Sequence, residues 1–159
     1  MKEKSCCFTG HRVVPVQYEK AVCDGLVYEI TRLIEKGYTD FFVGGALGFD
    51  TLAAQAVLKL RRTYPQIRLN LALPCRDQDV RWNESDRAVY RDILRQADSV
   101  TYVCERYTRG CMFERNRFLV DRSSVCLAFM TKMSGGTAYT VRYASEKEVC
   151  VINIAENCV

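Results

Sequence analysis

The sequence predicts an α/β fold: a single doubly wound, mostly parallel sheet of about six strands with helices on both faces. Short apolar runs alternate with amphipathic segments along the 159 residues, a pattern that favours parallel strands joined by right-handed helical crossovers. Most of these runs are apolar throughout instead of alternating with polar residues. This second observation is typical of strands that helices cover on both faces.

The first half of the chain contains three predicted strands, each followed by a helix. In the first helical segment Val22, Leu26 and Ile30 recur at the spacing of one helix face, and Gly37 follows where the helix should end. Pro74 ends the third apolar run, since proline cannot donate a hydrogen bond within a sheet. The predicted strands are residues 5–9, 39–43 and 67–73, and the predicted helices are residues 17–36, 50–62 and 84–96.

The second half repeats the alternation. We expect strands at residues 99–104, 124–129 and 149–154, and helices at residues 111–122 and 137–146. No linker, internal repeat or low-complexity segment interrupts this order. We therefore expect residues 1–159 to form one domain, whose length suffices for a sizeable core.

The composition argues against several classes of protein. The net charge is +4 and basic residues alternate with acidic ones, so nucleic-acid binding is not favoured, although a local basic site stays open. No apolar run approaches the length of a membrane span, and the N-terminal residues lack the long apolar stretch of a signal peptide. We expect a cytoplasmic protein without membrane contact.

Nine cysteines suggest a disulfide framework until their positions are considered. Cys6, Cys7, Cys104, Cys126 and Cys150 fall in apolar, strand-like runs, where cysteine behaves as a small buried apolar residue. No CxxC pair occurs and the chain has a single histidine, so the ligand spacing of a zinc site is absent. We expect a reduced protein with free thiols and no metal site.

Glycine-rich segments follow two of the predicted strands. The second strand leads into Gly44-Gly45-Ala46-Leu47-Gly48-Phe49-Asp50, and the fifth leads into Ser134-Gly135-Gly136-Thr137. Glycine permits close approach of a ligand to the backbone, and a helix that begins there directs free N–H groups and its positive dipole end at an anion. Tight turns alone would also explain one such segment, but two at the same sheet edge favour a binding cleft.

The residues predicted to bind the ligand lie at the carboxyl ends of the strands. Hydroxyls without an acid make residues 134–137 suitable for a phosphate, whereas Asp50 should meet ribose hydroxyls or an amino group, or serve only as a helix cap. Arg12 and Arg115 are candidate phosphate ligands. The full predicted set is Gly10, His11, Arg12, Gly44, Gly45, Gly48, Asp50, Arg115, Asn116, Ser134, Gly135, Gly136 and Thr137.

An ordered series of motifs carries a family resemblance. It comprises residues 8–12, the glycine segment 44–50, Gln78 with Trp82, residues 112–116 with 120–121, and residues 135–137 with 143–144. Together these resemble the YpsA-like family of the SLOG superfamily, Rossmann-like proteins that include the LOG phosphoribohydrolases and the DNA-processing protein DprA. The resemblance implies a nucleotide-derived ligand such as NAD or ADP-ribose. It does not assign a cofactor.

One position departs from the enzymes of that superfamily. Residues 112–116 resemble the LOG arginine motif with Arg115 as its arginine, but Thr140 occupies the position of the LOG glutamate. A threonine cannot supply the carboxylate that glycosidic hydrolysis needs, which argues against LOG-type catalysis. If the protein is an enzyme, the candidate catalytic residues are Asp50, Glu114 and Arg115.

Three functions follow from these observations. We favour a binding or sensor protein for a nucleotide-derived ligand such as NAD, ADP-ribose or a nucleoside phosphate. The alternatives are an N-glycosyl or phosphoribosyl hydrolase of nucleotides and a DprA-like binder of single-stranded DNA. The resemblance also leaves a homo-oligomer open, with Tyr90, Tyr102 and Tyr107 either at an interface or packed in the core or cleft.

Overall fold

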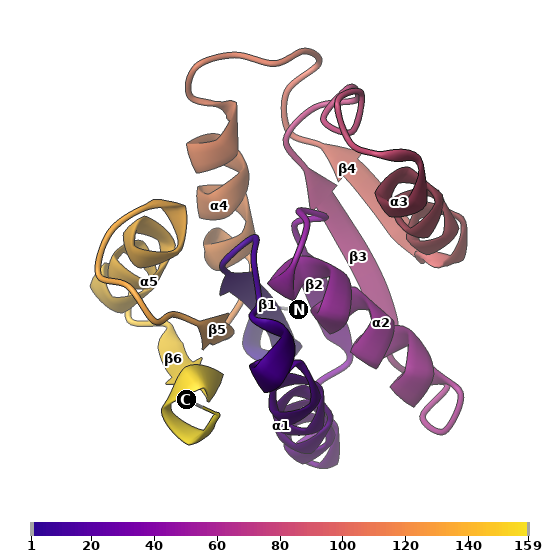
Figure 1. The fold of residues 1–159 in the computed structure, drawn as a ribbon. Coiled ribbons are helices and arrows are strands. Elements are labelled where there is room, and N and C mark those ends of the chain that lie inside the picture. The colour runs from indigo at the N-terminus through magenta and orange to yellow at the C-terminus, as the bar shows by residue number, and fades with distance from the viewer. Residues whose placement is uncertain (1, 159) are drawn as a thin grey trace.

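The computed structural model describes residues 2–158 and contains one six-stranded sheet in which every pair of neighbouring strands is parallel (Figure 1). The strands are β1 (Ser5–Gly10), β2 (Asp40–Val43), β3 (Arg68–Leu73), β4 (Ser99–Tyr102), β5 (Val125–Phe129) and β6 (Cys150–Asn153). The helices are α1 (Val16–Glu35), α2 (Phe49–Arg61), α3 (Glu84–Gln96), α4 (Cys111–Asp121) and α5 (Gly136–Glu146). Short 3-10 helices η1 (Lys2–Lys4) and η2 (Ile154–Asn157) flank them. The predicted fold class is confirmed.

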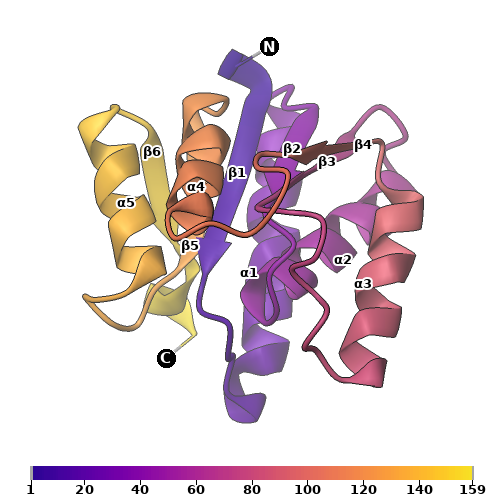
Figure 2. The same ribbon diagram turned by 90° about the horizontal axis from the view of Figure 1, so that it is seen from above.

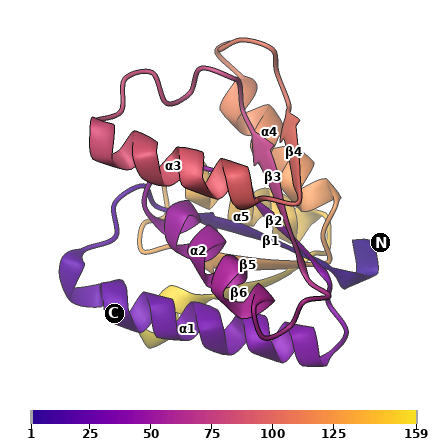
Figure 3. The same cartoon turned by 90° about the vertical axis from the view of Figure 1, so that its right-hand side faces the viewer.

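The strand order β4-β3-β2-β1-β5-β6 reverses direction between β1 and β5. The first four strands add in one direction from β1, and the chain then returns through α4 to the other side of β1 (Figure 2). Right-handed crossovers place helices on opposite faces before and after such a reversal. Accordingly α1, α2 and α3 pack along one face (Figure 3), while α4 and α5 pack together on the other.

The core lies on both faces because successive side chains of the central strands point in opposite directions. In β1, Cys6 and Phe8 pack into the larger apolar cluster beneath α1 and α2, whereas Cys7 packs into the smaller cluster beneath α4 and α5. Almost the whole of β1 is buried, which fits the absence of alternation in its sequence.

The two edge strands differ from the prediction of strands that are apolar and buried throughout. Three of the four residues of β4 are exposed, and Cys150 at the start of β6 is exposed. Cys104 lies after the end of β4 and is half-buried. The predicted burial of Cys104 and Cys150 was therefore wrong, because each lies at or beyond a sheet edge where helices cover only part of the surface. All nine cysteines are free.

Tyr90, one of the tyrosines considered for an interface, is buried in the core. Its ring contacts the edge of Trp82 at 5.0 Å between centroids, and its hydroxyl accepts a hydrogen bond from Gln78. Burial raises the pKa of Tyr90 to about 12. Tyr107 is exposed. In residues 2–158 no helix is both long enough and apolar enough to cross a membrane.

Candidate functional site

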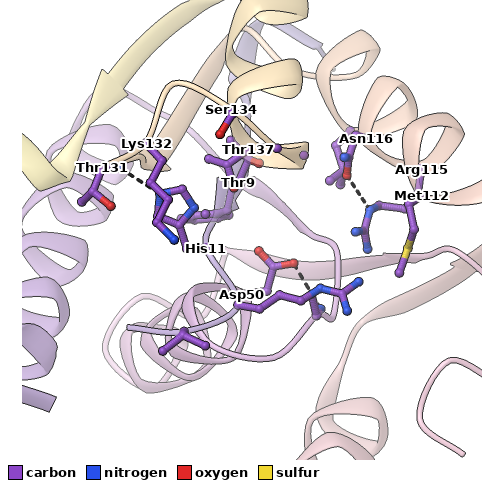
Figure 4. Close-up of a pocket in the computed structure, with 18 of the residues that line it drawn as sticks. Thr9, His11, Asp50, Met112, Arg115, Asn116, Thr131, Lys132, Ser134 and Thr137 are labelled. Atoms are coloured by element: carbon purple, nitrogen blue, oxygen red, sulfur yellow. Dashed lines mark hydrogen bonds between the residues drawn. The ribbon is translucent and has the colours of Figure 1, made fainter. Parts of the chain in front are cut away.

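A cavity of about 610 Å³ opens at the carboxyl ends of β1 and β5, where the strand order reverses (Figure 4). This is the place where doubly wound sheets bind ligands, and the volume suits a small organic molecule. The predicted residues that line the cavity are Gly10, His11, Arg12, Asp50, Arg115, Asn116, Ser134, Gly135, Gly136 and Thr137.

The N-terminus of α5 forms one wall of the cavity. Gly135 caps this helix with a positive φ of 93°, and a Cβ atom at Gly135 or Gly136 would meet no other atom within 4 Å. The amides of the first helical turn have no acceptor within their own helix, and they carry the positive end of the helix dipole. Ser134 and Thr137 add hydroxyls to the same wall, so its chemistry suits an anion.

Asp50 lies in the first turn of α2, and its side chain lines the cavity floor with only 6% exposed. Gly48, not Asp50, is the N-cap of α2. Oδ2 accepts a hydrogen bond from the Ala46 amide at 3.1 Å, whereas Oδ1 is buried without a partner in residues 2–158. Burial raises the pKa of this carboxyl above its usual value, against the opposing effect of Arg115. Oδ1 is thus an acceptor without a donor.

Arg115 of α4 is almost fully buried beside the same floor. Its Nη1 donates to the carbonyl oxygen of Gly44, and its Nε donates to Asn116 Oδ1 at 2.8 Å. These two contacts fix the plane of the guanidinium group. Burial lowers the pKa of Arg115 from its usual value, partly offset by the nearby Asp50.

The glycines of the first glycine-rich segment lie outside the cavity lining, to which that segment contributes Ala46 and Asp50. A Cβ at Gly44 would lie 2.6 Å from Nη1 of Arg115, and one at Gly48 would lie 2.2 Å from the backbone oxygen of Arg12. Gly45 has a positive φ of 73° and faces Leu73. In the structure these glycines permit close packing beside the site, and their role as ligand contacts stays a prediction.

His11 links the loop after β1 to the loop after β5 at the cavity mouth. Its Nε2 accepts a hydrogen bond from the Thr131 amide at 2.8 Å, and its ring stands edge-on to Phe129. Burial and the neighbouring Lys132 lower the pKa of His11 from 6.5, which fits an unprotonated Nε2. Sequence reasoning missed Thr131 and Lys132 as lining residues. Their position directly after the fifth strand was the available signal.

Comparison with known proteins decides the family. Residues 17–152 match the YpsA family model, described as the YspA SLOG family. The chain belongs to this SLOG family. A UPF0398 protein of Bacillus pumilus is 34% identical to this SLOG protein over 132 residues, which are 81% of this chain and 69% of the relative. A UPF0398 protein of Halalkalibacterium halodurans is 33% identical over 76% of this chain and 65% of its own length. The chain thus spans about two thirds of the length of these relatives.

Two solved structures share the fold. DNA processing protein A from Helicobacter pylori, studied for its binding of single-stranded DNA, aligns with a TM-score of 0.66 over 94% of this chain and 64% of that one, at 19% identity. DNA processing protein A from Streptococcus pneumoniae aligns with a TM-score of 0.64 over 94% of this chain and half of that one. At this level of identity the likeness establishes the fold of the SLOG protein.

The residues considered in connection with catalysis differ in whether they line the cavity. Glu114 lies outside the cavity lining and accepts a hydrogen bond from the Cys104 thiol at 3.1 Å. Thr140 is buried, and its hydroxyl donates to the Gly136 carbonyl oxygen within α5. Among residues 2–158, Asp50 is the one carboxylate that lines the cavity of the SLOG protein.

Acidification is expected to destabilise the SLOG protein through His11, the only histidine of the chain. The folded pKa of His11 lies below the unfolded value of 6.5, so the unfolded state binds the proton more readily. Its contribution is complete above pH 6.5 and is lost as the pH falls through the folded pKa. Urea unfolding at pH 7.5 and 5.5 should show a loss in the wild type that is smaller in His11→Asn. Asp50 acts in the opposite direction in both proteins, since its folded pKa is raised. Equal losses in both proteins would contradict this role of His11.

Proposed function

We propose that this SLOG protein binds a nucleotide-derived ligand such as ADP-ribose, NAD or a nucleoside phosphate. A phosphate would lie on the N-terminus of α5, and a ribose hydroxyl would donate to Asp50. The observation that carries this proposal is the buried Oδ1 of Asp50, which has no donor in residues 2–158 and lines a cavity walled by a helix N-terminus. Buried polar atoms rarely stay unpaired, so a ligand hydroxyl or amine is the natural donor.

The charges of the lining favour an anionic ligand. Arg12, Arg115 and Lys132 line the cavity, and Asp50 is the single carboxylate that does so in the described part of the chain. A positive cleft raises the local concentration of phosphates and orients them as they bind. A binding role without hydrolysis is supported by Thr140, whose hydroxyl is engaged within α5 and which offers no carboxylate. The nine free thiols support a reducing compartment, so we place the protein in the cytoplasm.

Ligand titration tests the proposal. AMP, ADP-ribose and NAD are added separately while thermal unfolding is followed, and a ligand at a hundredfold excess over its Kd should add about 2.7 kcal/mol to the free energy of unfolding. Asp50→Asn should weaken binding of the active ligand by roughly tenfold or more, since a hydrogen bond to a charged group contributes about 1.5–3 kcal/mol. Asp77→Asn, an exposed acid outside the lining, is the matched control.

Two results would reject the proposal. One is the absence of any shift with all three compounds. The other is an Asp50→Asn protein that binds as tightly as the Asp77→Asn protein, because the unpaired Oδ1 would then have no part in recognition. Release of free base from AMP during the titration would instead indicate the hydrolase.

A further inference from the structure

Arg115 carries a buried charge that no carboxylate contacts directly in residues 2–158. Its side chain is 5% exposed, yet neither Arg115 nor Arg12 forms an ion pair within residues 2–158. The contacts of Arg115 are to neutral acceptors, the Gly44 carbonyl and the Asn116 amide oxygen. A buried charge is costly unless it is paired, and the nearby Asp50 offsets that cost only in part, so an anionic ligand would stabilise this guanidinium group.

Arg12 adds a second cation at the same place. It interacts electrostatically with both Asp50 and Arg115, and all three residues line the cavity. Two guanidinium groups thus act electrostatically on one carboxylate, and burial opposes the ionisation of that carboxylate. One carboxylate cannot neutralise two guanidinium groups. Arg12 and Arg115, here called the arginine pole, therefore carry a net positive charge even when the charge of Asp50 is included.

The arginine pole and the wall formed by α5 come from different segments of the lining: the pole comes from the loop after β1 and from α4, and the wall comes from residues 134–137. Figure 4 shows Lys132 and Arg115 on opposite sides of the cavity, with Ser134 and Thr137 above and Asp50 between the two sides in this view. The lining thus supplies positive groups for a first subsite, residues 134–137 with Lys132, and for a second, Arg12 with Arg115. The unpaired Asp50 oxygen lies beside the second.

We propose that the ligand carries anionic groups on both sides of its sugar: one bound by the N-terminus of α5 and one bound by Arg12 and Arg115, with a sugar hydroxyl between them on Asp50. This inference rests on the proposed function and specifies its ligand. The chemistry is phosphate–ribose–phosphate, which occurs in a free nucleoside 3′,5′-bisphosphate and in an RNA strand, where the 2′-hydroxyl is free to donate to Asp50. A nucleoside monophosphate would fill only one of the two subsites.

Three adenosine compounds test the two-subsite site by isothermal titration of the purified chain. AMP has one phosphate, adenosine 3′,5′-bisphosphate has one on each side of the ribose, and ADP has both on the same side. The bisphosphate should bind about tenfold or more tightly than AMP, since each charge-assisted contact is strong, and ADP should gain less. A bisphosphate that binds no more tightly than AMP, or an ADP that equals it, would overturn the inference while leaving the proposed function intact. No binding by any of the three would also overturn the inference, and the proposed function would then depend on the titrations with ADP-ribose and NAD.

Arg12→Gln locates the second anion. Arg12 lines the cavity but is an exposed residue, so its replacement should not disturb the core. The ratio of the two Kd values, AMP over bisphosphate, should fall to about one in Arg12→Gln and stay at the wild-type value in Arg106→Gln, an exposed arginine outside the lining. An unchanged ratio in Arg12→Gln would contradict the assignment of the second subsite.

A 5′-phosphorylated ribotrinucleotide identifies the source of the ligand. Tighter binding than the bisphosphate, with an affinity that falls steeply with salt, would assign the site to a nucleic-acid strand. Equal or weaker binding would assign it to a free nucleotide. Both results retain phosphate–ribose–phosphate as the recognised chemistry.

Discussion

Gly48→Ala should lower the free energy of unfolding by about 3 kcal/mol or more, the largest stability loss that we expect from removing one glycine of this site. Gly48 has a φ of 77°, and its Cβ would lie 2.2 Å from the Arg12 oxygen and 2.7 Å from the His11 oxygen. Both are backbone atoms of the loop after β1, so neither can move aside as a side chain would. A shift of this loop to relieve the two contacts would also disturb the hydrogen bond from the Phe49 amide to the His11 oxygen.

Gly135→Ala is the matched control for that measurement. Gly135 also has a positive φ, of 93°, but an added Cβ would face open space. Its replacement should therefore cost only the backbone strain, about 1 kcal/mol. Urea unfolding of the two variants separates the energetic cost of the steric clash from the cost of backbone strain. Equal losses would show that the loop after β1 gives way without cost.

Gly136→Asp should weaken ligand binding by on the order of 100-fold, while the protein stays fully folded. The new carboxylate would stand at the N-terminus of α5, where it repels a phosphate. Because an added Cβ at Gly136 meets no atom within 4 Å, the fold has room for the side chain. An acid in the first turn of a helix also stabilises it slightly, so the melting temperature should stay equal or rise.

Gly136→Ala provides the comparison, since it adds the Cβ without the charge. It should bind the ligand nearly as the wild type does. Isothermal titration with the compound that gave a shift, together with a melting curve, checks both variants. If Gly136→Asp binds normally, the phosphate does not lie on α5; if both variants lose binding equally, the site rejects bulk and not charge.

The sheet could be predicted because periodicity and burial agree along most of the chain. The central strands lie between two helical layers, so their sequences carry no polar face, and β1 shows this most clearly. The edge strands escaped the prediction because their exposure depends on strand order, which the sequence does not state. Cys150 lies in an apolar run of the sequence, yet it is exposed in the structure. For Tyr90 the choice between interface and core stayed open for a related reason, since the side of α3 that faces the core is set by its neighbours.

The position of the site followed from a general rule about parallel sheets, so His11, Asp50, Arg115 and Ser134 could be named in advance and do line one cavity. Contacts between distant segments could not be foreseen. The guanidinium of Arg115 reaches the Gly44 carbonyl, and the imidazole of His11 reaches the Thr131 amide, across separations that no local pattern encodes.

The place of β1 in the sheet has a consequence for protein synthesis. Its partners are β2, which follows closely in the chain, and β5, with Cys7 opposite Cys126. On the ribosome, one side of this apolar strand waits without a partner until most of the polypeptide has emerged. An unpaired apolar edge is a template for aggregation, so the nascent chain needs protection during that interval. The arrival of β5 covers this edge of β1, and residues 131–137, which follow β5, then complete the ligand cavity.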